Sequence, residues 1–433
     1  MADLIAPDAA PDAARRPTMD IVRDGLAARH RREARLRLYG ILALGFAFGM
    51  LALVLVSLTA TGYKAFTQTH VALQVFVDPA EVSAEELPDG DFDDLIEASL
   101  LGYYPGDLER SERRAVTGIL SDGAEFILRD RIVADPGLIG QTIAIRVPVS
   151  DPYDQLAKGL IDRATPEANR RLDDAEVAAF DVLDEAGLIA QSPNWALVAN
   201  ADSRFPELAG LRGALVGSFW VLLICFAISF PLGIAAAIYL EEFAPKNRVS
   251  DFIEVNIHNL AAVPSVVFGL LGLAVFIGWF GMPRSAPIVG GLVLALMTLP
   301  TIIIATRASL KAVPPSIREA ALGVGASPQQ VVFHHVLPLA MPGILTGTII
   351  GLAQALGETA PLLLIGMNAF ITSAPDSPFQ AATTLPTQIF IWADSPERGF
   401  VSRTSAAILV LLFFLVLMNG LAIWLRNRFE RRW

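Results

Sequence analysis

The sequence predicts an all-α polytopic membrane protein that carries a small inserted α+β domain outside the membrane. Of its 433 residues, 53% are hydrophobic and 18% are charged, whereas soluble domains average about 25% charged residues. Apolar runs long enough to cross a bilayer recur along the chain, and one long hydrophilic stretch separates the first run from the others. These three observations argue against a soluble enzyme.

The apolar runs predict six transmembrane helices. A bilayer core requires about 20 apolar residues of helix, because each residue rises about 1.5 Å and unpaired peptide groups are not tolerated there. Six segments meet this requirement, approximately 40–61, 214–240, 260–280, 286–306, 343–367 and 404–425.

Basic residues predict that both termini are cytoplasmic. The tail 1–39 contains eight arginines and no obvious cleavage site, so the first span is expected to be an uncleaved signal anchor. The remaining loops and the carboxyl end on the same side hold Lys246, Arg248, Arg307, Lys311, Arg318, Arg426, Arg428, Arg431 and Arg432. The short loops on the opposite side hold Arg284, Arg398 and Arg403. This asymmetry follows the positive-inside rule and predicts a multi-pass protein of the inner (cytoplasmic) membrane.

The hydrophilic stretch 62–213 is predicted to be a separate periplasmic domain, followed by a membrane core at 214–433. It contains 13 basic and 28 acidic residues, so it accounts for the net charge of −11 and leaves a mildly basic remainder. Segments 70–77 and 141–149 have the β-branched, partly alternating pattern of strands. Segment 171–188 has helical spacing before Gly187. His70 is the only histidine of the stretch, and no catalytic constellation is recognisable.

Several kinds of chemistry are disfavoured by composition. Cys225 is the only cysteine, and no Cys/His cluster suited to a metal ion occurs. None of the four lysines follows a glycine, so the chain lacks the phosphate-binding loop of nucleotide hydrolases. We therefore expect no catalytic residues, no metal, no cofactor and no nucleic-acid partner.

The predicted inner loop 318–342 carries the most specific motif. It reads REAALGVGASPQQVVFHHVLPLAMP, and it resembles the EAA loop of ABC importer permeases. Matching positions are Glu319, Ala320, Ala321, Gly325, Leu337 and Pro338, while His335 replaces a branched apolar residue of the pattern. The resemblance implies that these positions contact an ATPase subunit.

The loop residues themselves predict two short helices joined by a tight turn. Glu319 is expected to begin an amphipathic helix, Gly325 to permit the turn, and Pro338 and Pro342 to stop the second segment before the membrane. The adjacent histidines 334 and 335 point in different directions on a helix, which favours packing or docking over metal binding.

The fifth predicted span contains the one ionisable residue found within any of the spans, Glu358. A carboxylate in a membrane helix is costly and suggests a functional role. Gly343, Gly347 and Gly351 recur every four residues and predict a smooth face for close helix packing. Pro361 frees the carbonyl of Gly357, so we expect a kink beside Glu358.

The stretch 342–366, which includes GETAPLL, resembles the PstA-type permeases of high-affinity phosphate importers. Stretches 231–248 and 259–276 agree with it, while the insert looks like an amino-terminal region added in some members. Many relatives carry arginine where this chain has Gln354, so the resemblance leaves the anion-binding residue open. Thr359 is expected on the substrate path with Glu358 and Gln354, and Arg307 is a candidate cation for it.

The resemblance implies a non-hydrolysing permease subunit of a phosphate importer that works by alternating access. Its implied partners are a second permease, two copies of an ATP-binding subunit and a periplasmic phosphate-binding protein. Glu358 could accept a hydrogen bond from the hydroxyl of protonated phosphate, which sulfate lacks. Alternatives are an ABC permease for another oxyanion or small solute, a proton-coupled secondary carrier that uses Glu358, and a membrane sensor. The sensor is disfavoured because no cytoplasmic output domain is recognisable.

Overall fold

The computed structural model describes residues 18–82, 90–104, 106 and 108–429. Its contacts divide the chain into two units, Met1–Ser57 and Leu58–Trp433, which are described separately. The first 17 residues of the predicted basic tail lie outside the described residues, and so do Arg431 and Arg432 at the carboxyl end.

A single long helix, α1 (Thr18–Gly62), contains the first predicted span in its carboxyl-terminal half. The helix begins well before the apolar residues, because the preceding segment is rich in alanine, leucine and arginine, which favour helix. The 3₁₀ turn η1 (Tyr63–Phe66) then leads into the first strand.

The insert is a small α+β fold, as its sequence predicts. Among the described residues, β1 (Thr67–Phe76) lies between β2 (Thr142–Pro148) and β3 (Ile189–Pro193), with both pairings antiparallel. The strands predicted at 70–77 and 141–149 are thus confirmed. Helices pack on this sheet around one apolar core. The helical elements of the insert are α2 (Phe92–Leu101), α3 (Arg110–Thr117), α4 (Ala124–Ala134), α5 (Asp151–Ala157) and α6 (Asp174–Glu185), with the 3₁₀ turns η3 (Pro136–Leu138) and η4 (Glu167–Asn169). Helix α6 confirms the helix predicted in 171–188, and Gly187 beyond it has a φ of 69°.

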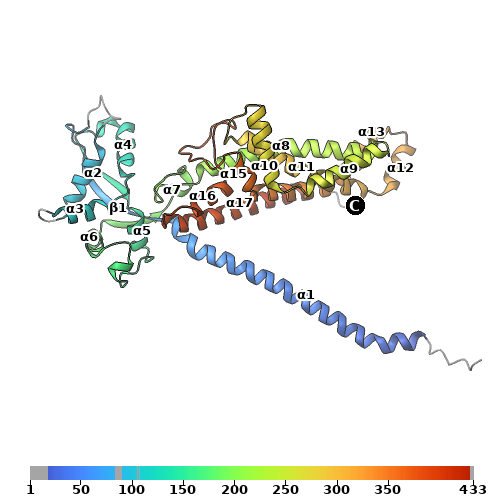
Figure 1. The fold of residues 1–433 in the computed structure, drawn as a ribbon, viewed down its shortest axis with the longest axis horizontal. Coiled ribbons are helices and arrows are strands. Elements are labelled where there is room, and N and C mark those ends of the chain that lie inside the picture. The colour runs from blue at the N-terminus through green and yellow to red at the C-terminus, as the bar shows by residue number, and fades with distance from the viewer. Residues whose placement is uncertain (1–17, 83–89, 105, 107, 430–433) are drawn as a thin grey trace, which may run out of the picture. The chain divides into compact units, whose positions relative to one another are not determined.

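The rest of the second unit is helical. Its elements are α7 (Ala196–Ala199), α8 (Arg212–Ile238), η5 (Tyr239–Phe243), α9 (Arg248–Ala261), α10 (Ser265–Leu271), η6 (Gly272–Trp279), α11 (Pro287–Lys311), α12 (Pro315–Gly323), α13 (Pro328–Gln330), η7 (Val331–Val336), α14 (Leu337–Gly357), α15 (Ala360–Leu364), α16 (Leu385–Ala393) and α17 (Gly399–Phe429), where η5, η6 and η7 are π-helical. Figure 1 shows α12 and α13 at one end of the bundle that contains α8, α11 and α17, and the insert at the other end.

Within the described residues, five helices are long and apolar enough to cross a membrane, or up to six if one bent pair counts as a span. That pair corrects the third predicted span, because 260–280 is not one helix. Instead α9 and the helix α10–η6 meet at an angle of 102°. Pro264 explains the break, since a proline disfavours helical geometry in the residue before it.

Helix α11 packs against both α8 and α14, and the glycine face of α14 lies on it. A β-carbon at Gly343 would collide with Ser309, and one at Gly347 would collide with Ala305. A β-carbon at Gly351 would lie 3.8 Å from Ile302 and Thr298, an ordinary contact distance. The predicted close-packing face is therefore confirmed, and its tightest point is at Gly343 and Gly347.

A buried ionic cluster joins the insert to the beginning of α17. Lys158 of the insert donates hydrogen bonds to the Asp154 carboxylate, at 2.5 Å, and to the carbonyl of Thr67, at 2.6 Å. Arg403 of α17 is 5% exposed and donates to the carbonyl of Ala209 at 2.5 Å. Burial lowers the pKa of Lys158, and the Asp154 carboxylate opposes this effect. Because buried charges are tolerated only when compensated, the insert and the membrane core depend on each other at this contact.

Candidate functional site

The loop that resembles an ATPase-coupling segment forms two helical segments and a tight turn. Helix α12 ends at Gly323, and Gly325 has a φ of 90°, a conformation that favours glycine. Ser327 then begins the second segment with a capping box, in which its hydroxyl accepts a hydrogen bond from the backbone N–H of Gln330. The predicted turn at Gly325 is thus confirmed.

The loop presents apolar and small side chains to the outside. Glu319 and Ala320 are exposed, whereas Ala321 is buried against the neighbouring helices. Leu322 and Val324 are exposed, Val324 to 86%. Apolar exposure at the end of a helix bundle is typical of a surface that contacts another subunit.

Two details of the predicted loop are wrong. Glu319 does not begin its helix, because α12 starts four residues earlier, at Pro315. Pro338 and Pro342 do not stop the second segment, since a continuous helical stretch runs from Pro328 to Gly357. The π-helical turn η7 ends at Val336, just before Leu337 and Pro338, so the hydrogen-bond pattern is already shifted where the proline lacks its N–H group. Leu337 and Pro338 are half-buried at the start of α14.

The loop is attached to the membrane helices by Arg318 of α12. Its guanidinium donates to the Glu242 carboxylate on η5 at 2.7 Å and to the carbonyls of Leu310 and Val313 at 2.9 and 2.8 Å. The sequence analysis did not single out Glu242. The sequence did contain a signal for it: Glu241 and Glu242 directly follow the second apolar span, and the next inner loop is basic.

Arg307 also contacts acids. It donates to Glu241 of η5 at 3.2 Å and forms an ion pair with Glu254 of α9 at 2.9 Å. Its guanidinium is therefore held between two carboxylates, and a role on the substrate path stays a prediction.

Glu358 lies at a helix break, which corrects the predicted kinked fifth span. Helix α14 ends at Gly357, Glu358 has φ −76° and ψ 121°, and α15 begins at Ala360. Glu358 and Thr359 are half-buried, and Gln354, one turn earlier on α14, is exposed. Pro361 explains the break. It has no N–H group to donate to the Gly357 carbonyl, and in a continuous helix its ring would clash with that carbonyl.

Gln354, Glu358 and Thr359 lie close in sequence at the end of α14, whereas Arg307 lies elsewhere on α11. Gly347 of α14 faces Ala305 of α11, two residues from Arg307. Glu358 is eleven residues beyond Gly347 along the chain, so Arg307 lies several helical turns away from the break.

Helix α10 packs against the same break. A β-carbon at Gly269 would come within 2.7 Å of the Cα atom of Pro361, so the two backbones are in close contact. The bent pair α9–α10 therefore reaches from Arg307, through Glu254, to the segment that follows Glu358.

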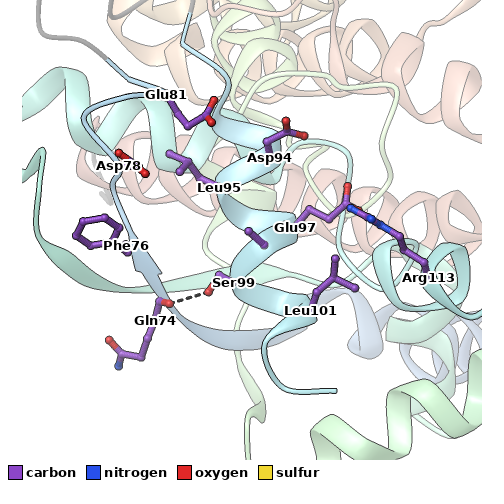
Figure 2. Close-up of a pocket in the computed structure, with 11 residues that line it drawn as sticks. Gln74, Phe76, Asp78, Glu81, Asp94, Leu95, Glu97, Ser99, Leu101 and Arg113 are labelled. Carbon is purple, nitrogen blue, oxygen red and sulfur yellow. Dashed lines mark hydrogen bonds and ion pairs between the residues drawn. The ribbon is translucent and has the colours of Figure 1, made fainter. Parts of the chain in front are cut away.

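The insert contains a separate cavity of about 570 Å³, shown in Figure 2. It lies beside β1 and α2, where the Ser99 hydroxyl donates to the carbonyl of Gln74 at 2.6 Å. Its ionisable lining residues are Asp78, Glu81, Asp94, Glu97 and Arg113. Partial burial and nearby carboxylates, first that of Glu97, raise the pKa of Asp93 next to it. Four carboxylates against one guanidinium make this cavity unsuited to an anion.

No group of three or more histidine, cysteine, aspartate or glutamate residues within the described part of the chain could hold a metal ion. His334 and His335 are both exposed on η7.

Comparison with known proteins identifies the family. Residues 229–433 match the binding-protein-dependent transport system inner membrane component, and residues 23–167 match a domain of unknown function, DUF3333. The probable ABC transporter permease protein YqgI of Bacillus subtilis is 32% identical over 233 residues, which cover 50% of this chain and 77% of that protein. The chain belongs to the binding-protein-dependent transport system inner membrane component family.

Two further relatives of this permease are phosphate transport system permease proteins. PstA of Yersinia pestis is 33% identical over 221 residues, covering 49% of this chain and 71% of PstA. PstA 1 of Mycobacterium tuberculosis (strain H37Rv) is 32% identical over 224 residues, covering 52% of this chain and 71% of that protein. The resemblance to PstA-type permeases with an added amino-terminal region is thus confirmed, and the permease is a multi-pass transport subunit of the inner membrane.

Proposed function

We propose that this permease moves inorganic phosphate into the cell as one of two membrane subunits of an ATP-driven importer. Its partners are a second permease, two copies of an ATP-binding subunit that hydrolyse ATP, and a periplasmic phosphate-binding protein. Both termini are cytoplasmic, so the loop that contains α12 faces the ATPase and the insert faces the periplasm. Closure of the ATPase subunits drives alternating access through this loop.

The observation that carries the proposal is the similarity of the membrane core to phosphate permeases, at 33% identity over 221 residues to PstA of Yersinia pestis. The helix break at Glu358 lies within GETAPLL, the stretch that resembles this type most specifically.

Glu358 supports a choice of phosphate over sulfate. Its half-buried side chain follows directly after the last residue of α14. Phosphate at neutral pH keeps at least one hydroxyl group, which can donate a hydrogen bond to a carboxylate. Sulfate has no such hydroxyl and would meet only repulsion, so the same group admits one anion and disfavours the other.

The neighbouring residues complete the proposed path. Gln354 offers an amide donor to a phosphate oxygen, and the Thr359 hydroxyl offers another. Compensating positive charge comes from the second permease, because Arg307 is held by Glu241 and Glu254 away from the break.

The coupling residues have a mechanical role. Glu319, Ala320 and Gly325 form the exposed part of the loop that fits a groove on the ATPase subunit. Buried Ala321 packs α12 on the neighbouring helices, and Leu337 and Pro338 connect the loop to α14. A rigid two-segment loop transmits displacement better than a flexible one, because little motion is lost within it.

The test is phosphate uptake by the assembled transporter in vesicles, with Glu358→Gln compared with the unmodified protein. We expect uptake to fall and exclusion of sulfate to weaken, because the amide can donate to either anion. Asp394→Asn, at an exposed site beyond α16, is a control that removes the same charge. Unchanged uptake and unchanged sulfate exclusion in Glu358→Gln would contradict the proposed role.

A second candidate is import of another small solute. The names of YqgI and of its Bacillus subtilis counterpart YqgH, which is 31% identical to this chain over 219 residues, specify an ABC transporter permease without a substrate. Competition of phosphate uptake by sulfate, molybdate and amino acids distinguishes the two candidates. A proton-coupled carrier would transport without the ATPase, so loss of uptake in Gly325→Pro with Glu358 intact would argue against it.

A further inference from the structure

Two adjacent glutamates at the end of α8 bind different helices. In η5, Glu241 accepts a hydrogen bond from Arg307 of α11 at 3.2 Å and lies 3.6 Å from Lys311. Glu242 accepts from Arg318 of α12 at 2.7 Å. Consecutive side chains on a helix project in different directions, so one short segment can hold two neighbours at once. This segment is therefore a junction between α8, α11 and the coupling loop.

The Glu242–Arg318 contact is more than a solvated surface pair. The two side chains are 11% and 24% exposed, and the same guanidinium also donates to the carbonyls of Leu310 and Val313. Ion pairs in water contribute little, but partial burial and several hydrogen bonds strengthen the contact and fix its geometry. The beginning of α12 is thus held on α8 and α11 together.

The Arg307 contacts extend the junction to the broken helix. Arg307 binds Glu254 of α9 at 2.9 Å, and α9 is followed by α10 after the 102° bend. Gly269 of α10 contacts Pro361, three residues after Glu358. Side-chain contacts, together with the backbone through the bend between α9 and α10, therefore link the coupling loop to the helix break.

We propose that Glu241 and Glu242 are positioning residues that make the coupling loop, α8 and the bent pair α9–α10 move as one body, so that ATPase closure displaces the segment beside Glu358. The inference rests on the proposed function and adds to it the residues that convert loop movement into movement at the substrate path. Glu242 acts through Arg318, and Glu241 acts through Arg307.

The experiment measures phosphate imported per ATP hydrolysed by the complete transporter in vesicles. The variants are Glu242→Gln, Arg318→Gln and the double variant, with Asp251→Asn as the control. Asp251 is exposed in the first turn of α9, and its substitution removes one negative charge from the same region. Subunit recovery on purification reports whether each variant assembles.

We expect both single variants to assemble and hydrolyse ATP, while the ratio of phosphate to ATP falls about fivefold to tenfold, in the range of coupling between distant sites. The double variant should be no worse than the singles, because both remove the same contact. Ratios like that of Asp251→Asn, additive losses in the double variant, or equal falls in assembly and uptake would overturn the inference. Absence of phosphate uptake by the unmodified transporter would instead contradict the proposed function.

Discussion

The carboxylate of Asp151 packs directly against Gly399, the first residue of α17, so closely that a β-carbon at Gly399 would collide with it. Asp151 belongs to α5 of the insert, and Arg171 and Gln155 donate hydrogen bonds to it at 2.9 and 2.8 Å. An anion at a helix amino terminus is also favoured by the helix dipole. The insert therefore fits the end of a membrane helix and is more than a tethered appendage.

This contact predicts that Gly399→Ala destabilises the protein. The new methyl group would press on Asp151 and on Pro206, and overpacking of this kind costs about 1–3 kcal/mol. Gly420→Ala in the same helix is the matched control, because the added carbon would have no atom within 4 Å other than those of its own helix turn. Alanine there should be neutral or stabilise by up to about 1 kcal/mol. Thermal unfolding of the detergent-purified protein checks both, and equal midpoints would contradict the assignment of Gly399 as a contact point.

The burial of Arg403 among residues of the insert predicts that substituting it destabilises the protein. The arginine lines the same small cavity as Asp151, Asp154 and Glu207, and Glu207 is 4% exposed. Arg403→Ala removes a buried guanidinium from beside these acids and leaves the Ala209 carbonyl without its donor, while Lys158 and Arg171 still pair with Asp154 and Asp151. The substitution should cost about 1–3 kcal/mol of unfolding free energy. Arg398→Ala, an exposed position just before α17, should change it by less than about 0.5 kcal/mol. Denaturation of the two variants side by side is the measurement, and similar values would refute the prediction.

The lowered pKa of His70 predicts that the insert loses stability at acidic pH. Burial lowers the pKa of His70 below its usual value, against the effect of Asp154 and together with Arg146 and Lys158. A lowered pKa favours the neutral ring in the folded state, so its contribution is present above about pH 6.5 and is lost as the pH falls below that value. The melting temperature should drop less between pH 7.5 and 5.5 in His70→Gln than in the unmodified protein. Parallel decreases in both would show that other groups are responsible.

The glycine face of α14 predicts a difference between two neighbouring substitutions. Gly347→Ala places a methyl group against Ala305 and should force α14 away from α11, which lowers both stability and transport. Gly351→Ala, one turn later, finds ordinary contact distances and should be tolerated. Phosphate uptake and the melting temperature of the two variants test this prediction. If both variants match the unmodified protein, α14 and α11 are not in close contact at Gly347.

Local features of the chain were predictable wherever one residue type or one short pattern fixes them. The turn at Gly325, the strands of the insert and the packing face of Gly343 and Gly347 depend on φ, on alternation and on spacing, all of which are written in the sequence. The helix end at Glu358 was anticipated only as a kink, because a proline indicates that a helix is disturbed without fixing how far the chain departs from it.

The sequence by itself determined that this is a membrane permease with an acidic inserted domain, because hydropathy, charge and the coupling motif are properties of contiguous residues. Only the tertiary structure decided that Glu242 holds Arg318, that Arg307 lies between two acids, and that Asp151 meets Gly399. These partners are separated by between 53 and 248 positions along the chain, and no local pattern encodes which charges meet. Packing of the helices selects those pairs, since a charge removed from water must find its partner wherever the fold brings one.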